Sequence, residues 1–114
     1  MKYTKNTRIN VRTIRRIPEG GGVTLRYGKP ISYSYGWQVG THGVECHTPE
    51  EVSKVIHSGE FRESCGIWYE NGIYYVDHCV HVTTKREAVE LGRQHNQLSI
   101  FGWGRKKMNP VLWL

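Results

Sequence analysis

The segment 73–82, IYYVDHCVHV, holds a dense group of side chains that could bind a metal or catalyse a reaction. A carboxylate, two imidazoles and a thiol, all zinc-ligand types, are supplied by Asp77, His78, Cys79 and His81. Alternating bulky residues predict a strand, in which neighbouring side chains point to opposite faces. His78 then lies opposite the other three. Asp77 and His81 are about 13 Å apart at ~3.3 Å per residue, too far to share a metal without Cys79 between them.

A zinc site on this strand would need ligands from distant parts of the chain. The candidates Cys46, His47 and Cys65 have spacings that match no zinc-binding pattern. A cysteine nucleophile is no better supported, because His81 would lie roughly 6–7 Å from Cys79 on an extended strand. The chain also lacks a nucleophile elbow, a phosphate-binding glycine loop and a paired-carboxylate motif. We therefore expect a protein with no metal, no cofactor and no enzymatic activity.

Binding chemistry has stronger support at the end of an expected helix, 84–97. Arg93 and Gln97 lie one turn apart on a helix face, and Asn96 follows Arg93 by three residues. A guanidinium, two amides and the nearby ring of Phe101 are suited to holding a phosphate and a flat base. A solvated helix end would have the same composition, so both interpretations stay open.

Further aromatic residues could also stack on bases. They are interleaved with Lys29 in the segment 27–37, YGKPISYSYGW, as Tyr27, Tyr33, Tyr35 and Trp37. Aromatic residues at this spacing are more typical of a core or an interface.

Two helices are marked by start and stop patterns. Thr48-Pro49-Glu50-Glu51 and Thr84-Lys85-Arg86-Glu87 follow the capping-box pattern, the first with proline at the first helical position. Gly59 is expected to end the first helix, and the second runs to about Gln97. Their apolar stripes are expected at Val52, Val55 and Ile56, and at Ala88, Leu91, His95 and Leu98.

Strand patterns occupy much of the remaining chain. The hairpin 66–82 is closed by Asn71-Gly72, a dipeptide that favours a two-residue type I′ turn. A second hairpin is expected over 37–46, around the turn Gly40–Gly43. Other strands are expected at 7–17 and 23–27, as a basic N-terminal strand pair, and at 98–104.

This order of elements predicts an α+β fold: an antiparallel sheet with two helices packed on one face, preceded by the basic N-terminal strand pair. The apolar end, VLWL at 111–114, is expected to dock onto the body or onto a partner chain.

The positive charge is concentrated at the N-terminus. Residues 1–30 contain eight Lys and Arg against one acid, a charge of +7, whereas residues 31–114 contain eight against nine, a charge of −1. We expect a basic arm with a glycine-rich joint over 1–22, followed by a single domain over 23–114. A polyanion such as nucleic acid would be the natural partner of such an arm, although a solubilising tail has the same composition.

The sequence contains none of the patterns expected of a membrane or secreted protein. It has no apolar run of about 18 residues, and its basic N-terminus lacks the apolar core of a signal peptide. Three cysteines without a CxxC pair argue against a disulfide scaffold. A cytosolic protein with no membrane partner is therefore expected.

From Gly36 to Trp103 the chain resembles a small module of phage and mobile-element proteins. The most specific matching segments are Arg86-Glu87-Ala88 and GRQHNQLSIF at 92–101; the others are GWQV at 36–39 and GIWYENGIYYVD at 66–77. The resemblance covers more than half of the 114 residues and leaves out the N-terminal arm and the basic C-terminal tail.

Within this group the chain is most similar to phage anti-Thoeris proteins of the first described type. These are non-enzymatic sponges that bind cyclic ADP-ribose-type signals and, in some members, cyclic dinucleotides. The resemblance implies a homo-oligomer, at least a dimer, that holds the nucleotide where chains meet. It also implies ligand contacts by Arg93 and Asn96, stacking by Phe101 or Trp103 on adenine, and a second phosphate contact by Arg105. The family pattern has a serine at Cys79, which puts a binding role for that thiol in doubt.

We therefore expect a phage-encoded antagonist of bacterial immunity that acts in the cytoplasm of the infected host. It would bind and sequester a nucleotide second messenger without degrading it, through Arg93, Asn96, Gln97, Phe101, Trp103 and Arg105. The alternative is an anti-defence inhibitor that binds nucleic acid or a defence protein through residues 2–16. A small structural phage protein that binds neither is a third interpretation.

Overall fold

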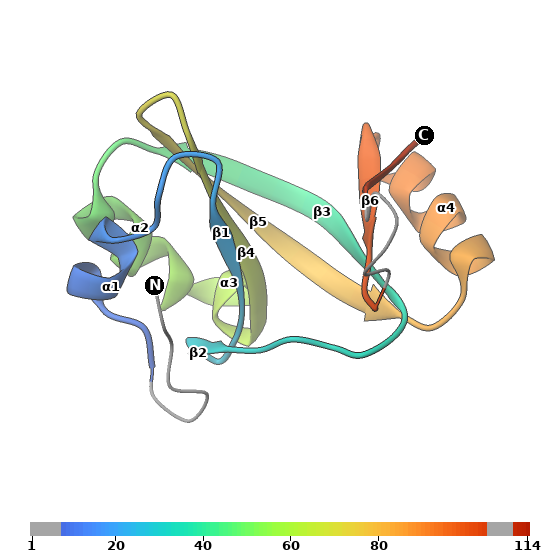
Figure 1. Ribbon diagram of the computed structural model, residues 1–114, viewed down its shortest axis with the longest axis horizontal. Helices are drawn as coiled ribbons and strands as arrows, with labels where there is room; N and C mark the ends of the chain where they lie inside the picture. Colours follow the sequence, from blue (N-terminus) through green and yellow to red (C-terminus); the bar gives the residue numbers. More distant parts are fainter. Residues whose placement is uncertain (1–7, 105–110) are drawn as a thin grey trace. The chain divides into compact units, whose positions relative to one another are not determined.

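The computed structural model describes residues 8–104 and 111–114, and over these residues the fold is α+β (Figure 1). Seven strands form an antiparallel sheet in the order β2-β1-β4-β5-β3-β6-β7. The strands are β1 (Gly22–Arg26), β2 (Lys29–Pro30), β3 (Trp37–Cys46), β4 (Ser64–Glu70), β5 (Ile73–Val82), β6 (Ser99–Gly102) and β7 (Val111–Trp113). The helices are α1 (Val11–Arg15), α2 (Pro49–Ile56), α3 (Gly59–Glu63) and α4 (Lys85–Gln94). The expected fold class and antiparallel sheet are confirmed.

The described chain divides into two compact units. The first contains the described residues up to Ile31 together with Gly43–His78, and the second contains Ser32–His42 and the described residues from Cys79 onward. The expected arm over 1–22 and single domain over 23–114 stay a prediction. In both units, no described helix is long and apolar enough to cross a membrane.

The segment 8–17 belongs to the core of the first unit. Val11–Arg15 form helix α1, and the side chain of Asn10 accepts a hydrogen bond from the Thr13 backbone N–H at 3.1 Å. Ile14 is fully buried, with Ile9 and Ile17 beside it in the same core. The prediction of a strand over 7–17 was therefore wrong. An Asn at the N-cap, with Thr three residues later, starts a helix and outweighs the apparent alternation.

Helix α2 begins where the sequence predicts. The Thr48 hydroxyl accepts a hydrogen bond from the Glu51 N–H at 3.1 Å, and Val52 and Ile56 are buried. The helix ends at Ile56, so Gly59 does not terminate it. Gly59 instead begins α3 with a φ of +51°, a conformation that suits glycine.

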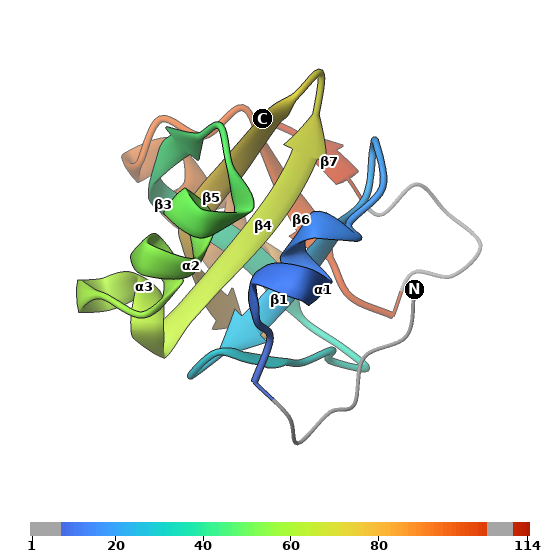
Figure 2. The ribbon, with the colours of Figure 1, turned by 90° about the vertical axis from the view of Figure 1, so that its left-hand side faces the viewer.

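Strand β1 lies alongside β4 in the first unit (Figure 2), with Leu25 opposite Cys65. The β4–β5 hairpin closes at the expected two-residue turn, with Glu70 opposite Ile73 and Trp68 opposite Tyr75. Its turn residues Asn71 and Gly72 have φ values of +52° and +78°. Two positive φ values are what a type I′ turn requires, so the predicted hairpin is confirmed.

The expected hairpin over 37–46 does not form, because these residues make the single strand β3. Gly43 was assigned to a turn, but the structure gives it a different role. A Cβ at this position would collide with the carboxylate of Asp77 and lie 2.7 Å from the Val76 carbonyl oxygen. The glycine thus permits a close approach of backbone to neighbouring groups.

The second unit is built around α4 and β6, which lie side by side in Figure 1. The Thr84 hydroxyl caps α4 by accepting from the Glu87 N–H at 3.2 Å, as predicted. A small core joins Ala88 of the helix to Val39 and Ile100. His95 and Leu98 are exposed, because the helix ends before either can join its apolar stripe.

The apolar end of the chain docks within this unit. Val111–Trp113 form β7, which pairs with β6, and Leu112 and Leu114 pack against the core. The expectation that the tail docks onto the body is confirmed.

Candidate functional site

The residues expected at the end of the second helix form a helix cap. The Asn96 N–H donates to the Arg93 carbonyl at 3.1 Å, and the Gln97 N–H donates to the Gly92 carbonyl at 2.8 Å. Asn96 has a φ of +56°, so the three residues close α4 in a Schellman arrangement. Arg93 and Asn96 are exposed and Gln97 is half-buried. The cap accounts for the position of Asn96 and leaves its side chain at the surface.

The two aromatic residues of the expected site, Phe101 and Trp103, lie next to each other. Their rings meet edge to face with centroids 5.0 Å apart. Arg105, the last expected contact, lies outside the described residues.

The backbone of β6 separates these two groups of residues. A Cβ on Gly92 of α4 would lie 3.1 Å from Ile100, so α4 packs on the face of β6 that carries Ile100. Adjacent side chains of a strand point to opposite faces, so Phe101 points away from α4. The structure therefore groups Arg93, Asn96 and Gln97 at one place, and Phe101 and Trp103 at another.

Phe101 and Trp103 are part of a larger aromatic cluster within the second unit. Tyr33 stacks on His81 with ring centroids 3.8 Å apart and an interplanar angle of 10°. Trp103 approaches Tyr33 edge-on at 5.6 Å, and Tyr35 approaches His81 at the same centroid distance. We call these five residues the aromatic cluster: Tyr33, Tyr35, His81, Phe101 and Trp103.

His81 is held in place by the segment that carries the two tyrosines. Its Nε2 lies 2.8 Å from the Tyr35 carbonyl oxygen, and a carbonyl can only accept, so Nε2 carries the hydrogen. The backbone N–H of Trp103 donates to the Gly36 carbonyl at 2.9 Å. Gly36 has a φ of +87°, and a Cβ there would lie 2.5 Å from His81 Nε2. The glycine therefore allows the chain to fold closely over the imidazole.

Two features of the aromatic cluster are unusual for a well-packed hydrophobic core. Tyr35 is 60% exposed and Phe101 is 36% exposed. The indole Nε1 of Trp103 is buried and has no hydrogen-bond partner among the described residues. An unpaired buried donor costs about 1–3 kcal/mol, and a ligand acceptor placed there would recover that cost.

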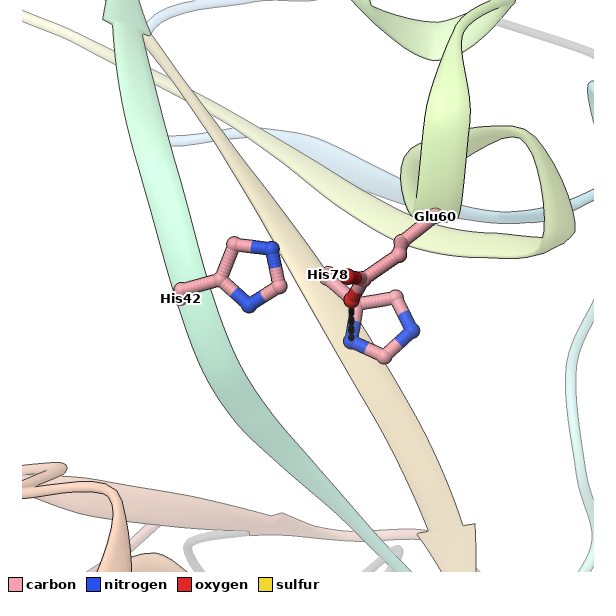
Figure 3. Close-up of side chains that lie close together, drawn as sticks. All are labelled: His42, Glu60 and His78. Atoms are coloured by element: carbon pink, nitrogen blue, oxygen red, sulfur yellow. Dashed lines mark ion pairs between the residues drawn. The ribbon is translucent and has the colours of Figure 1, made fainter.

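A second polar contact joins α3 to β5 within the first unit (Figure 3). His78 Nδ1 lies 4.0 Å from Glu60 Oε2. Glu60 is exposed, and His78 is half-buried.

The three cysteines that were considered as zinc ligands, Cys46, Cys65 and Cys79, are buried, and Asp77 is exposed. Burial raises the pKa of the Cys46 thiol, and the nearby Glu51 carboxylate raises it further. A neutral buried thiol is a poor nucleophile. The contact between His78 and Glu60 was not found from the sequence, because His78 was compared only with its neighbours in the strand.

Comparisons with protein-family models, curated proteins and solved structures gave no significant match. The functional interpretation therefore depends on the residues and geometry of this chain.

Proposed function

We propose that the protein binds a nucleotide second messenger, of the cyclic ADP-ribose or cyclic dinucleotide type, and sequesters it without cleaving it. The observation that carries the proposal is the aromatic cluster, with its exposed rings and the unpaired Nε1 of Trp103. In the biological setting implied by the sequence resemblance, the protein is a phage antagonist of bacterial immunity.

The chemistry of the aromatic cluster fits a nucleobase. Every base presents a flat π-face, and stacking on an aromatic side chain is worth ~1–3 kcal/mol per base. Phe101 and Tyr35 present exposed ring surface, and the indole N–H of Trp103 is a donor suited to a ring nitrogen or carbonyl oxygen.

The phosphates of such a ligand would need positive charge, which the chain carries in excess at +6. Arg93 is exposed at the end of α4, and it is the phosphate contact that we propose within the described residues. Within one chain, β6 lies between Arg93 and Phe101. The two contacts to one ligand can therefore come from two different chains. A homo-oligomer, in which Arg93 of one copy approaches the aromatic cluster of another, fits this separation.

The test is capture and release of intact ligand. The purified protein is incubated with cyclic ADP-ribose isomers and cyclic dinucleotides, washed and heat-denatured, and the released compound is identified by mass spectrometry. Recovery of the unchanged ligand supports sequestration. A linear product would show an enzyme, and absence of capture by the folded protein would refute the proposal.

Two matched variants locate the site. Phe101→Ala should weaken capture by about 10-fold or more, equivalent to the loss of one stacked base. Trp113→Ala removes an aromatic residue that is 70% exposed but lies outside the aromatic cluster, and it should leave capture unchanged. Equal loss in both variants would place binding elsewhere.

A basic surface on the first unit favours a second candidate function, the binding of nucleic acid or of an acidic defence protein. Arg8, Arg12 and Arg16 are exposed, whereas Arg15 is engaged by Glu50 at 2.8 Å. Replacing the three exposed arginines with glutamine should abolish a salt-sensitive affinity for DNA or RNA, with Arg62→Gln as an exposed control. An affinity that is independent of salt would count against this function.

A further inference from the structure

An exposed tryptophan lies on the face of the sheet that is turned away from the core of the first unit. Cys65 and Ile67 of β4 are buried in that core, and because side chains alternate along a strand, Trp68 points to the other face. Trp68 is 46% exposed. It lies opposite Tyr75 of β5, which is half-buried. Packing in the core therefore does not account for Trp68.

Two neighbours determine how the indole of Trp68 lies on this face. Its Nε1–H donates to Glu70 Oε2 at 3.3 Å. Gly22 of β1 lies opposite Trp68, and a Cβ at Gly22 would lie 3.1 Å from Cε3 of the indole. Glycine at this position therefore lets the indole lean over β1. The ring is held beside a carboxylate before any ligand arrives, which reduces the ordering that binding would require.

The charge around Trp68 is negative, although the whole chain carries +6. Glu70 adjoins the indole, and Glu19 lies at the same end of the hairpin, where its carboxylate accepts a backbone N–H of the turn at 2.8 Å. Arg26 is the one Lys or Arg in β1, β4 and β5. It pairs with β4 four residues before Trp68, about 13 Å away along the strand. A cationic ligand matches this charge, whereas the phosphates of a nucleic acid would be repelled.

We propose that Trp68 and Glu70 bind the guanidinium group of an arginine on a partner protein. Tryptophan is the best aromatic partner for a cation, and a planar guanidinium stacks on the face of an indole. The Glu70 carboxylate accepts from the indole through Oε2, and its other oxygen, Oε1, can accept from the guanidinium. Lysine lacks the planar fork that stacks and donates at the same time, so arginine fits this pair better.

The test uses the peptide acetyl-Gly-Arg-Gly-amide and its citrulline analogue, which keeps the shape of arginine without the charge. Binding to the full chain is followed by NMR at low salt, because salt screens exposed charges. The signals observed are the backbone amides of β4 and the indole N–H of Trp68, which is assigned by its loss in Trp68→Phe. We expect saturable shifts with the arginine peptide and an affinity for the citrulline peptide that is weaker by about 5-fold or more.

Variants of the two proposed residues locate the site. Trp68→Ala and Glu70→Gln should each weaken binding of the arginine peptide by about 5-fold or more. Glu70→Gln keeps an oxygen that accepts from the indole, so its loss of affinity reports the charge and not the position of the ring. Trp113→Ala and Glu63→Gln change exposed residues of the same types outside the site and should bind normally. Circular dichroism confirms that each variant is folded, and Glu70→Gln decides the test if Trp68→Ala is not.

Three results would overturn the proposal: equal affinity for the arginine and citrulline peptides, absence of saturable shifts, or equal affinity in the site and control variants. The site lies in the first unit, and the residues proposed to bind the nucleotide lie in the second. Nucleotide capture is measured separately with Phe101→Ala, so failure of either proposal is recognised independently.

Discussion

Replacing Gly36 with alanine tests the geometry of the aromatic cluster directly. The change carries a backbone cost, because φ at Gly36 is +87° and an L-residue on the left-handed side of the map loses roughly 1–2 kcal/mol. It also carries a steric cost, because the new Cβ would lie 2.5 Å from His81 Nε2 and 2.7 Å from the Val82 carbonyl oxygen. Overpacking of this kind costs ~1–3 kcal/mol.

The two costs together give a loss of about 2–5 kcal/mol in the free energy of unfolding. For a chain of this size, ~1 kcal/mol lowers the melting temperature by about 4 °C, so Gly36→Ala should lower it by roughly 8–20 °C. Thermal unfolding followed by circular dichroism measures the change. The near-ultraviolet signal should weaken as well, because the clash displaces His81 from its stack on Tyr33.

Gly72→Ala is the matched control. Its φ is +78°, close to that of Gly36, but a Cβ at Gly72 meets nothing within 4 Å. Only the backbone cost remains, so its melting temperature should fall by about 4–8 °C. If the two variants were equally stable, the close approach of Gly36 to His81 would be refuted.

Three further predictions follow from helix capping, core packing and buried ionisable groups. Thr84→Ala removes the cap of α4 and should cost about 1 kcal/mol in chemical denaturation, whereas Thr84→Ser should retain most of the stability. Ile14→Ala empties a fully buried position and should cost ~2–5 kcal/mol by the same measurement; a loss below about 1 kcal/mol would contradict the burial of α1. Burial raises the pKa values of Cys46 and Tyr74, so the folded state retains these protons longer than the unfolded state. Their stabilising contribution is present below the unfolded pKa values, about 8.5 and 10, and is lost as pH rises through the folded values. Stability should therefore decline at alkaline pH, and Cys46→Ala should reduce that decline.

The parts of the fold that were predicted from sequence are those specified by short local patterns. Threonine at an N-cap with glutamate three residues later located both α2 and α4, because a side chain and a backbone N–H within one turn decide the helix start. Asn71-Gly72 located a hairpin for the same reason, since both residues accept positive φ. These patterns need no knowledge of distant contacts.

The parts that were mispredicted depend on longer-range packing. The glycines at 40 and 43 indicated a turn, but Gly43 serves a close approach to Asp77, which lies far away in the sequence. The N-terminal segment 7–17 was predicted to form a strand, whereas Val11–Arg15 form a helix. The isoleucines of this segment enter a core with residues from α2, β1, β4 and β5, and only the folded chain shows that partnership.

The candidate site was predicted only in part, because it also depends on contacts between segments that are distant in the sequence. Phe101 and Trp103 were identified, and their rings meet edge to face. Tyr33 and His81 join them from other segments, and sequence spacing alone contains no information about such a contact. Asn96 was predicted to contact the ligand through its amide. In the structure it caps α4 with a positive φ, a position where asparagine is common.

Trp103 provides the strongest reason to regard the aromatic cluster as a binding surface. The core of the second unit is formed by Val39, Ala88 and Ile100 with partly buried neighbours that do not include Trp103. Packing alone would be served by phenylalanine, which has no donor to leave unpaired. An indole whose Nε1 is buried without a described partner carries a cost of about 1–3 kcal/mol, which a bound acceptor would offset. Trp103→Phe should therefore maintain or raise the stability of the free protein while weakening ligand capture. A variant that lost stability and kept full capture would assign the indole to the fold and not to the ligand.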